Sequence, residues 1–468
     1  MNKQLLMMMV AILVLVKCNA ATHYVVPPGT AGANPTDPYT NWATAGTNII
    51  EVVNAATTNT APRVVWVTNG TYYLTNQIVI TSLLTLQSVN GRDLTILNGS
   101  LAGTNRCAWL NAVGAVFNGF TVSNFNAIGQ HGGVYIDRNS TVINSLFVNN
   151  SNRYTALNNT GGGGGGIMIS TAAGVIGGTI TNCIFKNNWA QSYGGGIYCA
   201  GVRMYGCIFD GNQGQNYYGG GISLSTEYNV ISNCTVINNL SIDGAGITAL
   251  GSGSNDILNC TITGNVARAG SGGGVYYGAT KTLTIKNCSI IANVATNRGG
   301  GVCGLLITMR NCLIARNNSV TNIGGGIWMT TGIVESCTIV SNYAKVSGGG
   351  VYIDGPGSSG TNNIIYFNTA GVSANNFTNT AGNTGLNYSC VIPAVDGTGN
   401  ITNNPLLVDL GGGNYRLQKI SPCINAGTNQ SWMNNAIDLD GIARIRYGIV
   451  DMGAYEMILR QGNIYRVR

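Results

Sequence analysis

Residues 299–342 read GGGVCGLLITMRNCLIARNNSVTNIGGGIWMTTGIVESCTIVSN, and the second half of this stretch repeats the first. Each half begins with three glycines and an aliphatic residue, Val302 or Ile327, and ends with the pattern Cys-x-Ile-x-x-Asn, at 312–317 and 337–342. The two copies are 25 residues apart. A period of this length is typical of solenoids, in which each repeat is one supersecondary unit stacked on its neighbours.

The same two patterns recur along most of the chain. The cysteine pattern, with Phe, Val or Ile at its third position, starts at Cys183, Cys207, Cys234, Cys260, Cys288, Cys312 and Cys337, and degenerate copies lie at 119–124, 145–150 and 363–368. The glycine pattern precedes an aliphatic residue at Val134, Ile167, Ile197, Ile222, Ile247, Val275, Val302, Ile327 and Val351. Successive cysteines are 24 to 28 residues apart. This spacing predicts an all-β, right-handed parallel β-helix with about 25 residues and three strands per coil.

Alternation along the strands predicts which residues fill the core. The aliphatic residue after the glycines, the cysteine and the residue two positions after the cysteine should point inward, and each such column stacks on itself at about 4.8 Å. Asparagine recurs at two corners, at Asn188, Asn212, Asn239, Asn265, Asn293, Asn317, Asn342 and Asn368, and at Asn182, Asn233, Asn259, Asn287 and Asn311. We interpret both columns as structural, because Asn tolerates left-handed backbone angles and its amide can bond the neighbouring coil.

The chain has 13 cysteines, and seven of them occupy one inward position once per coil. Twelve cysteines remain once Cys18 of the predicted signal peptide is removed. An even number of cysteines in an exported protein would suggest disulfides. Parallel side-chain vectors on neighbouring coils are poor geometry for a bridge, whereas free cysteine suits a buried column of small apolar residues. We therefore expect a mostly reduced ladder, without a metal because no His, Asp or Glu accompanies it.

The first 20 residues are typical of a secretory signal peptide, with Lys3, an apolar run at 5–16 and a cleavage position after Ala20. A lipoprotein signal ending at Cys18 is the alternative, which the preceding Lys17 disfavours. No later apolar run reaches the roughly 18 residues of a membrane helix, so we expect an extracellular or cell-surface protein.

The net charge of +7 includes two lysines of the signal. The repeats contain no basic run, which argues against nucleic acid as a partner.

Four segments are predicted. Residues 1–20 form the signal peptide, 21–62 an N-terminal cap with an amphipathic helix at 49–56, 63–369 the parallel β-helix, and 370–468 the terminal coils and a C-terminal capping module. The last boundary follows from the glycine pattern, which stops near Thr369.

The C-terminal residues carry a more specific signal, SPCINAG at 421–427, DLDG at 438–441 and DMGAYE at 451–456. This block resembles the C-terminal module of bacterial surface β-helix proteins called choice-of-anchor Q proteins. The glycine and asparagine patterns resemble the repeats of chlamydial polymorphic outer membrane proteins. Together these resemblances imply a β-helix repeat protein at the cell surface, and they mark a fold more than an activity.

We assign no catalytic residue and no metal ligand. Glycoside hydrolysis needs two carboxylates about 5 to 9.5 Å apart, and no adjacent coils place acids in one column. The acids of the repeats are Asp137, Asp210, Glu227, Asp243, Asp256, Glu335 and Asp354. In the C-terminal block, Asp438 and Asp440 begin like a calcium loop that lacks its closing glutamate. We expect these two acids to form structural ion pairs with Arg444 and Arg446, with calcium as the alternative and no other cofactor.

One outward column has a chemical bias. The position after the inward aliphatic residue is aromatic in five of nine copies, on a chain that is 8% aromatic. The five aromatic residues are Tyr135, Tyr198, Tyr276, Trp328 and Tyr352. Exposed rings in a row fit the faces of sugars, whereas rings that stack on each other or lie under a loop would only stabilise the sheet.

Three classes of function follow. The favoured one is a secreted or cell-surface β-helix protein, adhesin-like or glycan-binding through the aromatic column, with a polysaccharide or cell-surface glycan as its partner. The first alternative is an enzyme on the same fold, a polysaccharide lyase or glycoside hydrolase. The second alternative is a structural element of the envelope or matrix.

Overall fold

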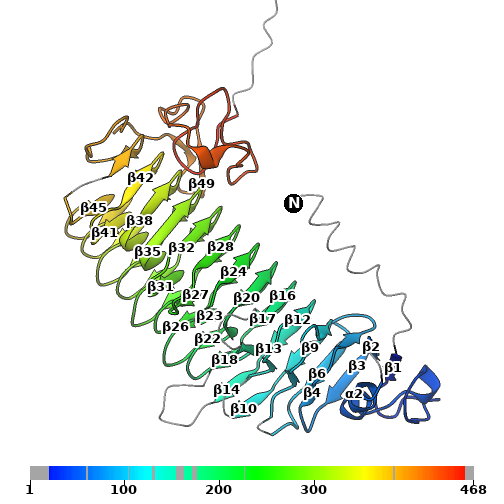
Figure 1. Ribbon diagram of the computed structural model, residues 1–468. Coiled ribbons are helices and arrows are strands. Elements are labelled where there is room, and N and C mark those ends of the chain that lie inside the picture. Colours follow the sequence, from blue (N-terminus) through cyan, green and yellow to red (C-terminus); the bar gives the residue numbers. More distant parts are fainter. Residues whose placement is uncertain are drawn as a thin grey trace, which may run out of the picture. The chain divides into compact units, whose positions relative to one another are not determined.

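The glycine and asparagine corners separate short strands, and each strand pairs in parallel with its counterpart one repeat away (Figure 1). The computed structural model describes residues 21–59, 62–103, 105–128, 132–153, 163–170, 177–225, 227–382 and 385–458, so that the predicted signal peptide lies outside the described residues. The chain divides into unit 1, Met1–Asn212, and unit 2, Gln213–Arg468. Within each unit the strands form a parallel β-helix, as predicted.

The strands of unit 1 fall into four rows, numbered in chain order from the glycine corner. The first row is β4 (Ile78–Ile80), β7 (Ala108–Leu110), β11 (Val134–Ile136), β15 (Ile167–Ile169) and β19 (Ile197–Cys199). The second row is β1 (Ala21–Val25), β2 (Arg63–Val67), β5 (Leu84–Ser88), β8 (Val116–Asn118), β12 (Ser140–Ile143), β16 (Gly178–Thr181) and β20 (Val202–Tyr205). The third row is β3 (Gly70–Tyr73), β6 (Thr95–Asn98), β9 (Thr121–Ser123), β13 (Leu146–Val148), β17 (Ile184–Lys186) and β21 (Ile208–Asp210). The fourth row is β10 (Asn126–Ile128), β14 (Ser151–Arg153) and β18 (Trp189–Ala190).

The strands of unit 2 form the same four rows. The first row is β23 (Ile222–Leu224), β27 (Ile247–Ala249), β31 (Val275–Tyr277), β35 (Val302–Arg310), β38 (Ile327–Glu335), β41 (Val351–Ile353) and β45 (Phe377–Asn379). The second row is β24 (Asn229–Ser232), β28 (Asn255–Leu258), β32 (Leu283–Lys286), the continuations of β35 and β38, β42 (Ser359–Thr361) and β46 (Leu386–Asn387). The third row is β25 (Thr235–Ile237), β29 (Thr261–Thr263), β33 (Ser289–Ile291), β36 (Leu313–Ala315), β39 (Thr338–Val340), β43 (Ile364–Tyr366) and β47 (Cys390–Val391). The fourth row is β22 (Gln213–Gly214), β26 (Leu240–Ser241), β30 (Val266–Ala267), β34 (Val294–Ala295), β37 (Asn318–Ser319), β40 (Tyr343–Ala344) and β44 (Thr369–Ala370).

One feature of this arrangement differs from the prediction of three strands per coil. The short fourth row was not predicted, because in unit 2 its two-residue strands give no alternation to read. Beyond residue 369, β45, β46 and β47 pair with β41, β42 and β43, so the segment assigned to the terminal coils begins with a further coil of the sheets.

The asparagine ladders are structural, as predicted. In unit 2 the amide oxygen of Asn265 accepts the backbone N–H of Asn239 at 3.0 Å, while its Nδ2 donates to the carbonyl of Val236 and to Asn293 Oδ1, both at 2.9 Å. Asn265 has no exposed surface. The same bonds link Asn150, Asn188 and Asn212 in unit 1. The second ladder has left-handed backbone angles, with φ of 53° at Asn259.

The inward columns stack like on like. In unit 1 the ring of Phe185 lies between those of Phe147 and Phe209, at centroid distances of 5.0 and 4.6 Å and nearly parallel. The cysteine column is buried in both units, and the described cysteines are thiols that form no disulfide. Burial raises the pKa of Cys288 well above its ordinary value, so this thiol stays protonated. The column serves as a small apolar core element.

The ends of the β-helix differ from the coils. Helix α2 (Ile49–Thr57) matches the predicted amphipathic helix, and its buried residues, among them Val52 and Val53, pack against β1, β2 and β4. Asn48 caps it by accepting the Ile50 N–H at 3.0 Å. Two short 3₁₀ turns lie at η1 (Trp42–Thr44) and η2 (Ser431–Met433). No helix among the described residues combines the length and apolar character needed to cross a membrane.

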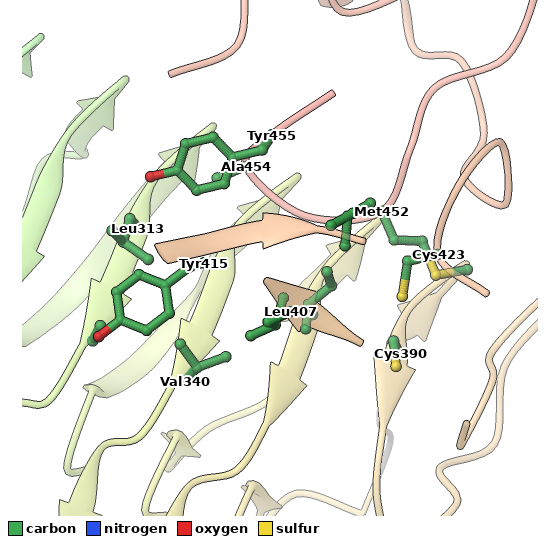
Figure 2. Packing of buried hydrophobic residues seen from close by; sticks show 12 residues of the cluster. Leu313, Val340, Cys390, Leu407, Tyr415, Cys423, Met452, Ala454 and Tyr455 are labelled. Atoms are coloured by element: carbon green, nitrogen blue, oxygen red, sulfur yellow. The ribbon is translucent and has the colours of Figure 1, made fainter. Parts of the chain in front are cut away.

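The C-terminal module, residues 401–458, folds back along the outer face of the third row in unit 2 (Figure 2). Its antiparallel hairpin, β48 (Leu407–Asp409) and β49 (Asn414–Leu417), and the DMGAYE block bury the outward side chains of β36, β39 and β43. The packed residues are Leu313, Ala315, Val340, Ile364, Leu407, Tyr415, Leu417, Met452, Ala454 and Tyr455. The module therefore covers a side of the coils.

Candidate functional site

The predicted aromatic column exists as a row on the outer face of the first-row strands. In unit 1, Met168 pairs with both Tyr135 and Tyr198. In unit 2, Tyr276, Cys303, Trp328 and Tyr352 follow one another in register. The side chains of this column are largely covered. Trp328 keeps only 6% of its surface exposed, and the four tyrosines are half-buried.

The glycine corner explains this burial. It folds over the column so closely that a Cβ on Gly324 would lie 2.8 Å from the Cβ of Trp328. The residue directly before the first glycine then lies beside the column and partly covers it. These residues are Tyr193 in unit 1 and Tyr218, Asp243, Ser271, Arg298, Ile323 and Ser347 in unit 2. This second column was not predicted from the sequence, although its position, one residue before each glycine motif, can be read from the repeat.

In unit 2 the two columns enclose a hollow of about 290 Å³. Its lining includes Ser271, Tyr276, Arg298, Cys303, Leu305 and Trp328. The guanidinium carbon of Arg298 lies 5.0 Å from the centre of the Trp328 ring, a cation–π contact that holds the arginine against the wall. Leu305 is 41% exposed at the rim.

Two donors of this hollow lack acceptors. Arg298 Nε and Trp328 Nε1 are buried and have no hydrogen-bond partner among the described residues. A buried donor left unpaired costs about 1–3 kcal/mol, which a ligand that supplies an acceptor would recover. The tyrosine hydroxyl of Tyr276 is a further donor, because burial raises its pKa to about 12 and keeps it protonated at neutral pH. The wall of the hollow therefore carries three hydrogen-bond donors, two of them without an acceptor among the described residues.

One carboxyl group stands next to this hollow. Asp243 Oδ1 accepts the backbone N–H of Ser271 at 2.5 Å, and burial raises the pKa of Asp243. The ring of Tyr218 stacks on Tyr276 at a centroid distance of 5.9 Å. No acidic residue is among the described residues that line the hollow itself. Two carboxylates flanking one substrate position, as glycoside hydrolysis needs, are therefore not brought together here.

Unit 1 has its own cluster on the same face of the first row. Tyr135 stacks on Trp109 at a centroid distance of 6.3 Å, and the guanidinium carbon of Arg106 lies 5.3 Å from the centre of the Tyr135 ring. The Tyr135 hydroxyl donates to Asp137 Oδ1 at 3.2 Å. Trp109 was not part of the predicted column, because its coil lacks the glycine motif.

The acidic residues of the C-terminal module have structural roles, but the predicted partners were wrong. Asp438 accepts the backbone N–H groups of Asp440, Ile442 and Glu456. Asp440 forms a bidentate ion pair with Arg416, and Arg444 Nη2 lies 3.2 Å from Glu456 Oε1. Among the described residues, no three His, Cys, Asp or Glu side chains are grouped so as to hold a metal ion.

Residues 106–290 match the family model described as the right handed beta helix region. This match confirms the right-handed parallel β-helix. Similar solved structures include pectate lyase Pel9A, at 13% identity over 93% of this chain and 96% of that chain with a TM-score of 0.35. Pectin methylesterase PemA from Erwinia chrysanthemi is 11% identical over 66% and 80% of the two chains, with a TM-score of 0.27.

The catalytic unit of a GH87 α-1,3-glucanase from Streptomyces thermodiastaticus is 12% identical over 76% and 64% of the two chains, with a TM-score of 0.32. Matches at this level of identity and TM-score do not bear on what this chain binds or catalyses. A search of curated proteins found no match.

Proposed function

We propose that this chain is a glycan-binding β-helix protein, and that the hollow around Arg298, Tyr276 and Trp328 receives the sugar. The observation that carries the proposal is the pair of buried donors without acceptors, Arg298 Nε and Trp328 Nε1, in a hollow walled by aromatic rings. Sugars offer many oxygen acceptors on a ring whose faces pack against aromatic side chains, so they match both features.

Binding is favoured over hydrolysis by the charges of the site. Asp243 is a single carboxyl group beside the hollow, and its oxygen is already engaged by the Ser271 N–H. Arg298 lies against Trp328, and a guanidinium offers only hydrogen-bond donors, so it serves as a donor and not as a base. An enzyme stays the alternative, and Asp243, whose side chain lies against Ser271 beside the hollow, would be its candidate general acid.

The location proposed for this function is the cell surface or the extracellular space. It rests on the signal-like residues 1–20 and on the resemblance of the C-terminal block to choice-of-anchor Q proteins. A purely structural role in an envelope or matrix would not account for the buried donors Arg298 Nε and Trp328 Nε1, which have no acceptor among the described residues.

A glycan array followed by calorimetry tests this proposal, with an assay for reducing ends and unsaturated products on the same glycans. We expect binding without product. Trp328→Phe, which removes the indole N–H, should weaken binding about fivefold, the value of one hydrogen bond of about 1 kcal/mol. Trp432→Phe is the matched control, because Trp432 Nε1 already donates to Gln430 Oε1 at 3.1 Å.

Two results would contradict the proposal. Product formation would establish the enzyme, and binding that is insensitive to both Trp328→Phe and Arg298→Gln would move the site away from this hollow.

A further inference from the structure

A second surface with the chemistry of a sugar site lies in unit 1, on the outer face of β4, β7 and β11. Val79, Trp109 and Tyr135 stand side by side there in strand register. Trp109 and Tyr135 are half-buried and stacked, and Arg106 covers part of the Tyr135 ring. The two rings present a short aromatic platform with a cation at one edge.

A shallow depression lies just beyond the ends of these strands. Thr81 and Asn111, which directly follow β4 and β7, line it together with Ser82, Leu83, Val113 and Arg138. Asn111 Oδ1 accepts Arg138 Nε at 3.0 Å, which holds the guanidinium at the rim. Asn111 follows the end of β7 and is two residues from Trp109, so platform and depression lie no more than about 7 Å apart along the chain.

Polar groups of this surface are buried without partners, as in unit 2. Trp109 Nε1 and Ser82 Oγ have no hydrogen-bond partner among the described residues, although both atoms are buried. Ser82 belongs to the depression and Trp109 to the platform, so unsatisfied groups occur at both ends of the surface. Leu83 and Val113, which are 47% and 64% exposed, flank it with apolar side chains.

We propose that this surface binds an oligosaccharide independently of the hollow in unit 2, so that one chain carries two glycan sites. The inference rests on the proposed function, because both sites take the same class of ligand. A sugar ring packs on Trp109 and Tyr135, and the next sugar places its oxygen atoms at Ser82 and Arg138. The elongated form of the surface favours a chain of sugars over a single one.

Calorimetry with cellotetraose, laminaritetraose and tetragalacturonate tests the second site. We expect two binding sites per chain for at least one of these probes. Arg138→Gln and Arg298→Gln form a matched pair, and each should weaken one of the two sites about tenfold and leave the other unchanged, since a charge-assisted hydrogen bond is lost in each case. Trp109→Phe should weaken the same site as Arg138→Gln.

Arg153→Gln is the control, because Arg153 is an exposed arginine of β14, a strand that contributes to neither surface. Circular dichroism and the unfolding midpoint establish that each variant is folded. Arg138 is exposed, so its replacement removes no buried packing.

The outcomes separate the two proposals. A single site that responds to Arg298→Gln and not to Arg138→Gln or Trp109→Phe overturns the second site and leaves the proposed function intact. A single site that responds only to the unit 1 variants supports this surface and removes the hollow of unit 2. No binding of any of the three probes to the unchanged protein contradicts both.

Discussion

The interior of the coils and the outer face of the first row follow opposite rules. Inside unit 2, Asn239, Asn265 and Asn293 make the same bonds from coil to coil. On the outer face, the neighbours Thr248, Tyr276, Cys303, Trp328 and Tyr352 are all unlike in size or chemistry. A buried amide must find a partner one coil away, so each coil restricts the next, whereas an outward side chain has water or a ligand as its alternative. Uniform columns therefore indicate folding, and irregular ones indicate where a ligand can be selected.

The largest loss of stability on substitution is expected in the core of unit 1. Phe185→Ala removes the middle ring of a three-ring stack that is fully buried, and should lower the free energy of unfolding by about 3–5 kcal/mol. Urea unfolding measures it. Ile208→Ala is the control, because Ile208 lies on β21 beside Phe209 but points outward with 37% of its surface exposed, and should cost less than about 1 kcal/mol. Equal losses in the two variants would show that the outer wall contributes as much as the core.

A second contrast lies within one coil of unit 2. Asn265→Ala leaves the buried N–H of Asn239 and the carbonyl of Val236 without their partner, and should lower the free energy of unfolding by about 2–4 kcal/mol. Asn259→Gly changes the exposed asparagine of the other ladder, whose φ of 53° suits glycine, and should change stability by less than about 1 kcal/mol. Chemical denaturation of both variants tests this. If Asn259→Gly is the more damaging variant, the corner and not the buried amide holds the coils in register.

The module that covers the third row contains buried charged side chains, Arg444, Asp451 and Glu456. Burial raises the pKa of Glu456 to about 8, against the influence of Arg444 and with that of Asp451. An unfolded glutamate titrates near 4.5, so between these values the folded state binds a proton that the unfolded state does not. Stability should therefore increase as the pH falls from about 9 to about 5, with a rise in Tm of roughly 2–4 °C.

Thermal unfolding across this pH range checks the prediction for the module. Glu456→Gln should be flatter with pH than the unchanged chain, because the amide cannot titrate. A Tm that falls steadily as the pH is lowered from 9 to 6 would contradict it.

The smallest effect on stability is expected on the outer face. Trp328→Phe removes an N–H that has no partner among the described residues and some packing, two changes that oppose each other. The free energy of unfolding should change by less than about 1 kcal/mol. A loss of 3 kcal/mol or more in urea unfolding would place Trp328 with the core columns and not with the ligand-facing ones.

The repeat predicted the fold because stacking leaves a period in the sequence. The inward columns, both asparagine ladders and the helix at 49–57 were all readable, since each depends on neighbours at a fixed spacing. Strands as short as Val294–Ala295 were not, because two residues carry no alternation. The β-helix was bounded at Thr369 and the coil beyond it was assigned to the terminal segment, because β45 begins with Phe377, without the glycine triplet that marks most of the preceding coils.

The candidate site was readable only in part. The sequence placed Tyr276 and Trp328 in one row, which the strand register confirms. It did not show that Arg298 lies over Trp328, because that contact joins the corner of one coil to the strand of the next. The ion pair between Asp440 and Arg416 could not be predicted either. Arg416 is 24 positions away, in a module that has no repeat to show which residues meet. Whether the five aromatic residues bind a ligand stays a prediction.

The asparagine ladder also bears on how the length of such a chain can change in evolution. Asn239, Asn265 and Asn293 use identical bonds, so each can substitute for its neighbour as a partner. Unequal recombination that removes one whole repeat, for example residues 266–293, would place Asn317 where Asn293 had been and leave every remaining amide paired. Copy number can thus drift by whole coils with little penalty, whereas an insertion of a few residues in a strand would shift the register of all side chains that follow within that coil.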